Sequence, residues 1–346
     1  MQQQQSFNSQ IKQLMILGLL LLLIFIVIKE MYVFLPGLLG AFTLYILSRG
    51  SYFQLVYYRK CRKGWAAGMF VLGFMILLGL LIYFTFFLLE KQVNPFLNNP
   101  ASSLSQAKQA IMDVQEKAGV VIVSDESLAN LQYRISAFVP SLVNDTMNLL
   151  FNLIILLFVF YYMLVHGKEM EAFLARIIPL KKTNIDALAS ETKRLVKVSA
   201  LGIPIISIIQ GVTATIGYII FGVNEFVLWG FFTGVFAFFP VVGTMIIWVP
   251  LVIYMYVSGD SWNAMSLAIY SLVVTGNVDY LARITLLKKM GNVHPIVTVI
   301  GVIVGLGLFG FIGLIFGPLL VNYIILLFRI YMNEFIEHKE EDTSDG

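Results

Sequence analysis

The residues best able to do chemistry gather in one short stretch, GNVDYLAR, which holds Asn277, Asp279 and Arg283. The stretch closes a long apolar run, and ionisable side chains inside membrane-spanning segments are costly and usually functional. Asp279 and Arg283 stand four positions apart, so on a helix they share one face and can pair. The stretch predicts either a coupling-ion or substrate site, or an ion pair that anchors the end of a helix at the membrane surface.

Two further polar residues lie within or beside apolar sequence. Gln210 belongs to SIIQGVTATIG, where its amide needs a partner. That partner is either a transported species or a neighbouring helix. His294 precedes Pro295 at an expected helix start, and we consider a proton-relay role for it, with an interfacial position as the alternative.

The signatures of an enzyme do not occur in the sequence. It contains no G-x-S-x-G, no H-E-x-x-H, no Walker A motif and no G-x-G-x-x-G after a strand. One cysteine and three scattered histidines predict no disulfide and no metal site. We therefore expect no catalytic residues, no cofactor and no ATP-driven pump in this chain.

Composition indicates whether water or lipid surrounds the chain. Of its 346 residues, 59% are hydrophobic and only 12% are charged, and the mean hydropathy is +0.85. Soluble domains carry roughly 25% charged residues. The charges here are too few to cover a protein of this size, so lipid must cover much of its surface. The net charge of +3 forms no basic stripe with interleaved aromatics, and nucleic-acid binding is not expected.

The apolar runs predict an all-α polytopic membrane protein. A transmembrane helix needs about 20 apolar residues. Runs of about this length cover 13–28, 32–48, 65–89, 147–166, 198–220 and, more weakly, 262–280. Two longer tracts, 225–257 and 295–333, are interrupted by glycine and proline. We therefore expect about six full transmembrane helices plus two broken or re-entrant helical hairpins.

Lysine and arginine in the short loops predict the orientation. Basic residues gather in 59–63 and again in 168–197, and both segments lie an even number of crossings from the N-terminus. The N- and C-termini are therefore expected in the cytoplasm. The predicted regions are a three-helix membrane region 1–89, an extracytoplasmic polar helical insert 90–146, a fourth helix and basic cytoplasmic segment 147–197, a transport core 198–333 and a disordered tail 334–346.

The two interrupted tracts resemble one another. The first breaks at Pro240 and Gly243, in FFPVVG. The second breaks in a glycine-rich stretch containing Gly310, Gly313, Gly317 and Pro318. Each tract follows one helix, and as hairpins they would enter from opposite sides, giving an inverted repeat. Paired interruptions of this kind indicate the binding site of a secondary transporter. The alternative is that glycine and proline here only serve close helix packing.

Several segments of the C-terminal half resemble the autoinducer-2 exporter (AI-2E) family of bacterial permeases. They are GIPIISIIQGVTATIGYIIFGV, FFPVVGTMIIWVP, GNVDYLAR, NVHPIVTVIGVIVG and LFGFIGLIFGPLL, in the family's order. Tyr280 stands where the family usually has Asn, and Ile284 where it has Pro. The N-terminal half is similar only in its layout of helices.

The resemblance implies an inner-membrane permease. It implies a secondary transporter that exports a small polar solute such as autoinducer-2 or exchanges monovalent cations for protons. It also implies a homo-oligomer, with a pentamer as the expectation. In the antiport case Asp279 is the group that would carry the proton. The alternative function is a non-transporting membrane scaffold or assembly protein.

Overall fold

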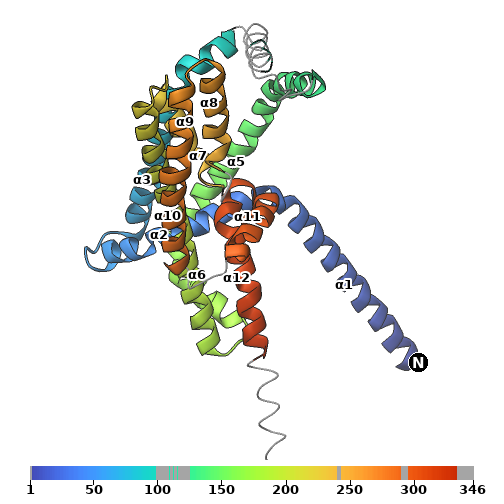
Figure 1. The fold of residues 1–346 in the computed structure, drawn as a ribbon. Coiled ribbons are helices and arrows are strands. Elements are labelled where there is room, and N and C mark those ends of the chain that lie inside the picture. The colour runs from blue at the N-terminus through green and yellow to red at the C-terminus, as the bar shows by residue number, and fades with distance from the viewer. Residues whose placement is uncertain are drawn as a thin grey trace, which may run out of the picture.

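All described elements of the protein are helical. The computed structural model describes residues 2–98, 109, 112, 115, 125–239, 243–289 and 295–332 (Figure 1). Within these described residues, five helices are long and apolar enough to cross a membrane, or up to six when a bent pair is counted as one span. The all-α, multi-pass class predicted from the sequence is confirmed. Within the predicted polar insert, residues 99–108, 110–111, 113–114 and 116–124 lie outside the described residues, as does the whole C-terminal tail.

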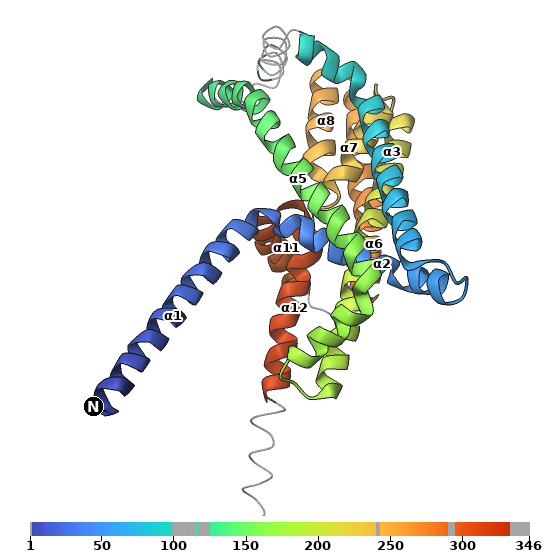
Figure 2. The ribbon, with the colours of Figure 1, turned by 180° about the vertical axis from the view of Figure 1, so that it is seen from behind.

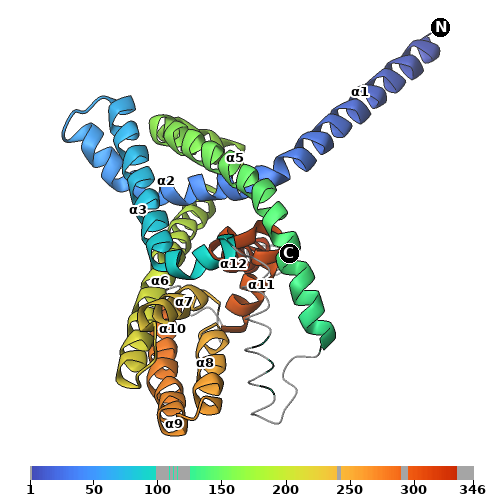
Figure 3. The same cartoon turned by 90° about the horizontal axis from the view of Figure 1, so that it is seen from above.

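The first two helices follow one another without a loop. Helix α1 (Gln2–Met31) leads through η1 (Tyr32–Phe34) into α2 (Leu35–Tyr57), and together they form one long candidate span, Lys12–Tyr57. The sequence placed two separate helices here. Pro36 lies in the first turn of α2, where its missing N–H leaves no helical hydrogen bond unmade, so the helix resumes after one tight turn. Helix α1 projects away from the rest of the molecule (Figure 3).

Helices α3 (Lys63–Asn98) and α5 (Asp125–Ile177) complete the N-terminal half. Helix α5 is 53 residues long, and α2 packs across it (Figure 2). Tyr52 of α2 and Phe160 of α5 are both buried in the cluster of apolar side chains between these helices. One face of α5 is therefore an internal surface, whereas the apolar side chains of α3 are mostly exposed, as expected of a helix that faces lipid.

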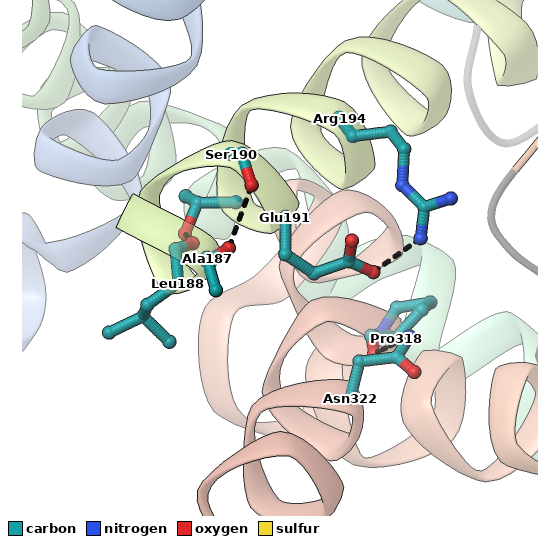
Figure 4. Close-up of polar contacts among 8 residues, drawn as sticks. Ala187, Leu188, Ser190, Glu191, Arg194, Pro318 and Asn322 are labelled. Carbon is teal, nitrogen blue, oxygen red and sulfur yellow. Dashed lines mark hydrogen bonds and ion pairs between the residues drawn. The ribbon is translucent and has the colours of Figure 1, made fainter. Parts of the chain in front are cut away.

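Helix α6 (Lys182–Ile220) connects the two halves of the molecule. Its first half packs against α12 (Gly313–Tyr331), where the hydroxyls of Thr192 and Tyr323 are hydrogen-bonded. Figure 4 shows the local polar contacts beside this junction, which include the Glu191–Arg194 ion pair at 2.6 Å and the Asn322 amide donating to the Pro318 carbonyl at 3.0 Å. Its second half, beyond the internal Pro204, enters the C-terminal bundle.

The first interrupted tract forms two short helices, α7 (Phe226–Phe236) and α8 (Met245–Val257). At 1.5 Å per residue they span about 17 and 20 Å, less than the roughly 30 Å hydrocarbon core of a bilayer. Neither helix can cross alone, which favours a hairpin over two crossings. A Cβ at Gly243 would lie 2.5 Å from the Phe239 carbonyl oxygen, so only glycine fits at this turn. Pro240 lies outside the described residues.

The next span combines α9 (Ser261–Tyr270), η2 (Ser271–Thr275) and α10 (Gly276–Lys289). Asp260 begins it as an N-cap, accepting a hydrogen bond from the Asn263 backbone N–H at 3.4 Å. The middle element, η2, is a π-helix. Such wide turns are rare and occur frequently at functional sites, and no pattern in the sequence marked this one.

The second interrupted tract is also a hairpin. Helices α11 (Pro295–Phe309) and α12 are joined by the short η3 (Gly310–Ile312), and the chain bends by 118° at the break. Gly310 has a φ of +60°, in the left-handed region that glycine adopts without strain. The sequence left open whether this tract is a re-entrant hairpin or a pair of crossings, and the bend shows that the chain turns sharply at the predicted break.

Glycines let the two arms of this hairpin pack backbone against backbone. A Cβ at Gly301 would lie 2.7 Å from the Pro318 Cα, and one at Gly305 would lie 2.6 Å from the Gly317 Cα. A Cβ at Gly313 would overlap the Gly305 carbonyl group. The predicted break residues Gly313, Gly317 and Pro318 therefore act mainly through this close contact within α11 and α12.

The two hairpins occupy different parts of the molecule. In Figure 1 the α7–α8 pair lies beside α9 in the upper half, whereas α12 runs to the lower end. Each hairpin follows a long helical span, α6 in the first unit and the α9–α10 span in the second. This order agrees with the repeated organisation expected of the C-terminal half.

Replacing Gly305 by alanine should destabilise the hairpin by about 1–3 kcal/mol, because the added methyl group meets backbone atoms that cannot move aside. Gly307→Ala is the matched control on the same helix, since a Cβ there meets no atom within 4 Å. The control should leave stability unchanged or raise it by up to about 1 kcal/mol. Unfolding temperatures of the purified variants in detergent measure the difference, and equal behaviour would contradict the packing described.

Candidate functional site

Two of the polar residues singled out in the sequence meet in the C-terminal bundle. The Nε2 group of Gln210 on α6 donates a hydrogen bond to the Asp279 carboxylate on α10, 69 residues further along the chain. Gln210 is fully buried and Asp279 is partly buried. Both lie within helices long and apolar enough to cross a membrane. The contact therefore places a carboxylate against an amide inside the apolar part of the molecule.

Helices α6 and α9 are held together just beside this contact. The Tyr270 hydroxyl, at the last residue of α9, donates to the Thr213 carbonyl of α6 at 2.9 Å. The Tyr270 ring lies so close to Gly217 that a Cβ there would overlap it. The π-helix follows immediately, with Ser271 and Thr275 buried. The packing of α9 on α6 thus fixes the start of the helix that carries Asp279.

One turn of α6 also presents two buried oxygen atoms with no hydrogen-bond partner among the described residues. They are the Ser207 Oγ and the Gln210 Oε1. Ser207 is 6% exposed and Gln210 is 0% exposed. Residues three positions apart on a helix face the same way. Buried polar atoms are nearly always paired, so these two oxygens, one of them on the amide that contacts the Asp279 carboxylate, are acceptors that a cation or a hydroxyl-bearing solute could satisfy.

Of the other predicted site residues, the structure describes the side chain of Asn277, which is not brought to this contact. The Asn277 side chain is exposed and donates to the Val273 carbonyl of its own helix at 2.5 Å. The side chain of Arg283 and all of His294 lie outside the described residues. The expected Asp279–Arg283 ion pair and the proton-relay role of His294 therefore stay predictions.

A second polar cluster, which the sequence did not indicate, joins α2 to α5. The Arg49 guanidinium holds the Glu171 carboxylate through two contacts, Nε to Oε1 at 2.5 Å and Nη2 to Oε2 at 2.6 Å. The Tyr45 hydroxyl donates to the same carboxylate at 2.7 Å. A Cβ at Gly167 would overlap the Tyr45 ring. Arg49 follows directly after an apolar run, so the sequence pattern suggested only a residue at the end of a helix.

Comparison with known proteins identifies the family of this chain. The family model described as "AI-2E family transporter" matches residues 14–333. The chain belongs to this family. The resemblance inferred from the C-terminal motifs is confirmed, and the match extends through the N-terminal half, where the sequence showed similarity only in layout.

Curated relatives carry names of the same kind. A "Putative transport protein" of Helicobacter pylori is 28% identical over 235 residues, covering 64% of this chain and 65% of the relative. One of Aquifex aeolicus is 23% identical over 242 residues, covering 70% of this chain and 67% of the relative. The chain thus spans about two thirds of the length of these relatives. The family and these names support a membrane transporter, and the apolar helices support a multi-pass membrane protein.

In this AI-2E family transporter, Ser207 is the buried polar residue beside Gln210 that the sequence did not single out. Serine is common in membrane helices, and nothing in SIIQG distinguishes a serine that hydrogen-bonds its own helix from one that does not. Its position one turn before Gln210 was the available signal, because residues three apart share a face. The π-turn before Asp279 had no such signal.

Ser207→Ala should change the stability of the folded transporter by no more than about 0.5 kcal/mol, because the hydroxyl has no partner to lose. Thr233→Val is the comparison. The buried Thr233 hydroxyl is hydrogen-bonded to the Tyr218 hydroxyl at 2.8 Å and to the Trp229 carbonyl at 2.8 Å. Its loss should cost about 1 kcal/mol. Thermal unfolding in detergent tests both, and an equal loss at Ser207 would make that residue structural.

Proposed function

We propose that this AI-2E family transporter is a secondary transporter whose solute or coupling-ion site lies at Gln210 and Asp279. The cargo is a small polar solute, exported as autoinducer-2 would be, or a monovalent cation exchanged for protons. The observation that carries the proposal is the Gln210–Asp279 contact beside two unpartnered buried oxygens. Polar groups at membrane depth are expensive and usually functional.

The donor set supports a polar cargo. Asp279 contributes a carboxylate, Gln210 an amide oxygen and Ser207 a hydroxyl oxygen, and all of these can accept a hydrogen bond or bind a cation. An apolar cargo would leave the two buried oxygens unsatisfied. A proton on Asp279 would remove its charge, so proton binding and cation binding would compete at this carboxylate.

The placement of the site supports transport by movement of two repeated units. Gln210 lies on the long helix before the first hairpin, and Asp279 lies on the span before the second. Rocking of one unit against the other would break and remake their contact. Transporters of inverted-repeat architecture place their sites at the interface between the repeats.

The same proposal includes the cellular setting. The protein is placed in the bacterial inner membrane with both termini in the cytoplasm, on the strength of the basic loops at 59–63 and 168–197. It is proposed to act as a homo-oligomer, with a pentamer as the family's implication. The transporter family supports the expectation that the chain is not an enzyme.

Asp279→Asn should lower flux at least tenfold in proteoliposomes under an imposed pH gradient, with autoinducer-2 or Na⁺/Li⁺ as cargo, because it removes the charge and an acceptor from the site. Asp260→Asn makes the same chemical change at the start of α9, where asparagine also caps a helix well, and it should leave flux unchanged.

Equal flux in wild type and Asp279→Asn would make Asp279 structural and move the site elsewhere. If the wild-type protein moves none of these cargoes under any gradient, the alternative function of a non-transporting membrane scaffold is favoured instead. Flux that persists without a gradient would argue against coupled transport. Each outcome requires that the variants elute as a single species of wild-type size.

A further inference from the structure

A cleft lies on the far side of α2 from the transport core, between α2, the start of α3 and α5. Tyr52, Phe53 and Tyr57 of α2, Lys63 of α3, and Lys168 and Glu169 of α5 line it. The cleft is shallow and open to solvent, with room inside for about one water-sized group, so a larger ligand would lie over its mouth. The cleft lies outside the Gln210–Asp279 site and serves no step proposed for transport.

The charges of this cleft do not balance. Glu169 is engaged by the His166 Nδ1 at 2.7 Å, and the neighbouring Glu171 is held by Arg49 through two contacts. Lys63 and Lys168 have no carboxylate within 4.0 Å in the part of the chain that the structure describes. The neutral form of His166 would leave the Glu169 charge in place, so the cleft carries two ammonium groups against one carboxylate, and an anion would complement the remaining positive charge.

The Lys168 ammonium and the backbone of Lys63 are held in place. The Lys168 Nζ lies over the Tyr57 ring at 4.1 Å and over the Phe53 ring at 5.4 Å from their centroids. This cation–π contact fixes the ammonium and leaves its N–H groups able to donate. The Tyr52 hydroxyl donates to the Lys63 carbonyl at 3.2 Å, which ties the start of α3 to α2. The two charges are thus part of a shaped surface.

Exposed aromatic residues locate the cleft at the depth of lipid headgroups. Tyr57 is 50%, Tyr58 86% and Trp65 76% exposed, and they flank the basic run 59–63. Tyrosine and tryptophan favour the membrane–water interface, and lysine and arginine gather on its cytoplasmic side. Beyond Trp65 the exposed face of α3 is apolar, so acyl chains could lie along it while a headgroup lies over the mouth of the cleft.

We propose that this cleft binds the phosphate group of an anionic phospholipid through Lys63 and Lys168. Ammonium groups bind phosphate as point charges, and each basic residue near an anionic membrane surface strengthens binding several-fold. A free phosphate ion offers the same chemistry, but the adjoining apolar face of α3 favours the lipid. The proposal is independent of the cargo and of the transport site.

Native mass spectrometry of the full-length protein in detergent, titrated with phosphatidylglycerol, tests the site. The double variant Lys63→Gln/Lys168→Gln should bind this lipid roughly 30-fold more weakly than wild type. Lys182→Gln/Lys197→Gln, on α6, removes the same charge elsewhere and should bind within about twofold of wild type. Lys63→Arg/Lys168→Arg keeps both charges and should retain most of the binding.

Phosphatidylcholine, which has no net charge, should bind far more weakly than phosphatidylglycerol to wild type and equally weakly to the variants. Unchanged phosphatidylglycerol binding by Lys63→Gln/Lys168→Gln would overturn the site. An equal loss of binding in Lys182→Gln/Lys197→Gln would show that the lipid does not bind specifically at this cleft, because any basic surface would then bind it. Displacement of the lipid by an equimolar amount of inorganic phosphate would overturn the lipid as ligand and assign the cleft to soluble phosphates.

Discussion

The hydrogen bond between the Gln210 amide and the Asp279 carboxylate is the contact around which the C-terminal half is organised. A carboxylate among apolar helices is unfavourable unless other polar groups solvate it. Gln210 supplies one such group from a helix 69 residues away, and the packing of Tyr270 on α6 holds the two helices at the required separation. The same arrangement leaves the Ser207 and Gln210 oxygens without partners, which gives a polar cargo something to bind.

The two interrupted tracts are subject to a second requirement, that backbone polar groups within a membrane be hydrogen-bonded. Backbone groups in hydrocarbon must be satisfied, so an interrupted helix is tolerated only where protein or a polar cavity covers the break. In the second hairpin, glycines at 301, 305, 313 and 317 bring α11 and α12 into direct backbone contact. In the first, Gly243 fits a turn that has no room for a Cβ. In the second hairpin, packing of the two arms therefore covers backbone next to the break.

Much of the fold was predictable because the lipid environment imposes long apolar runs that can be read directly. Asp279 and Gln210 stood out for the same reason, as polar residues in such runs. Their contact was not predictable, since helix periodicity says nothing about which helices are neighbours. The joining of α1 to α2 and the pairing of Arg49 with Glu171 likewise depend on tertiary packing. The π-turn before Asp279 has no periodic signal at all, and Ser207 resembles any other serine in a membrane helix.

The most direct test of the proposed site is whether a reagent can reach the Ser207 face of α6 from both sides of the membrane. Cys61 is the single native cysteine, so Ser207→Cys in a Cys61→Ser background places one thiol beside Gln210 and Asp279. A membrane-impermeant thiol reagent is applied to either side of sealed vesicles, with and without cargo. The thiol should react from one side of the membrane under one gradient and from the other side under the opposite gradient. Cargo should slow both reactions. A thiol that reacts from neither side under any gradient would contradict a transport site at this contact.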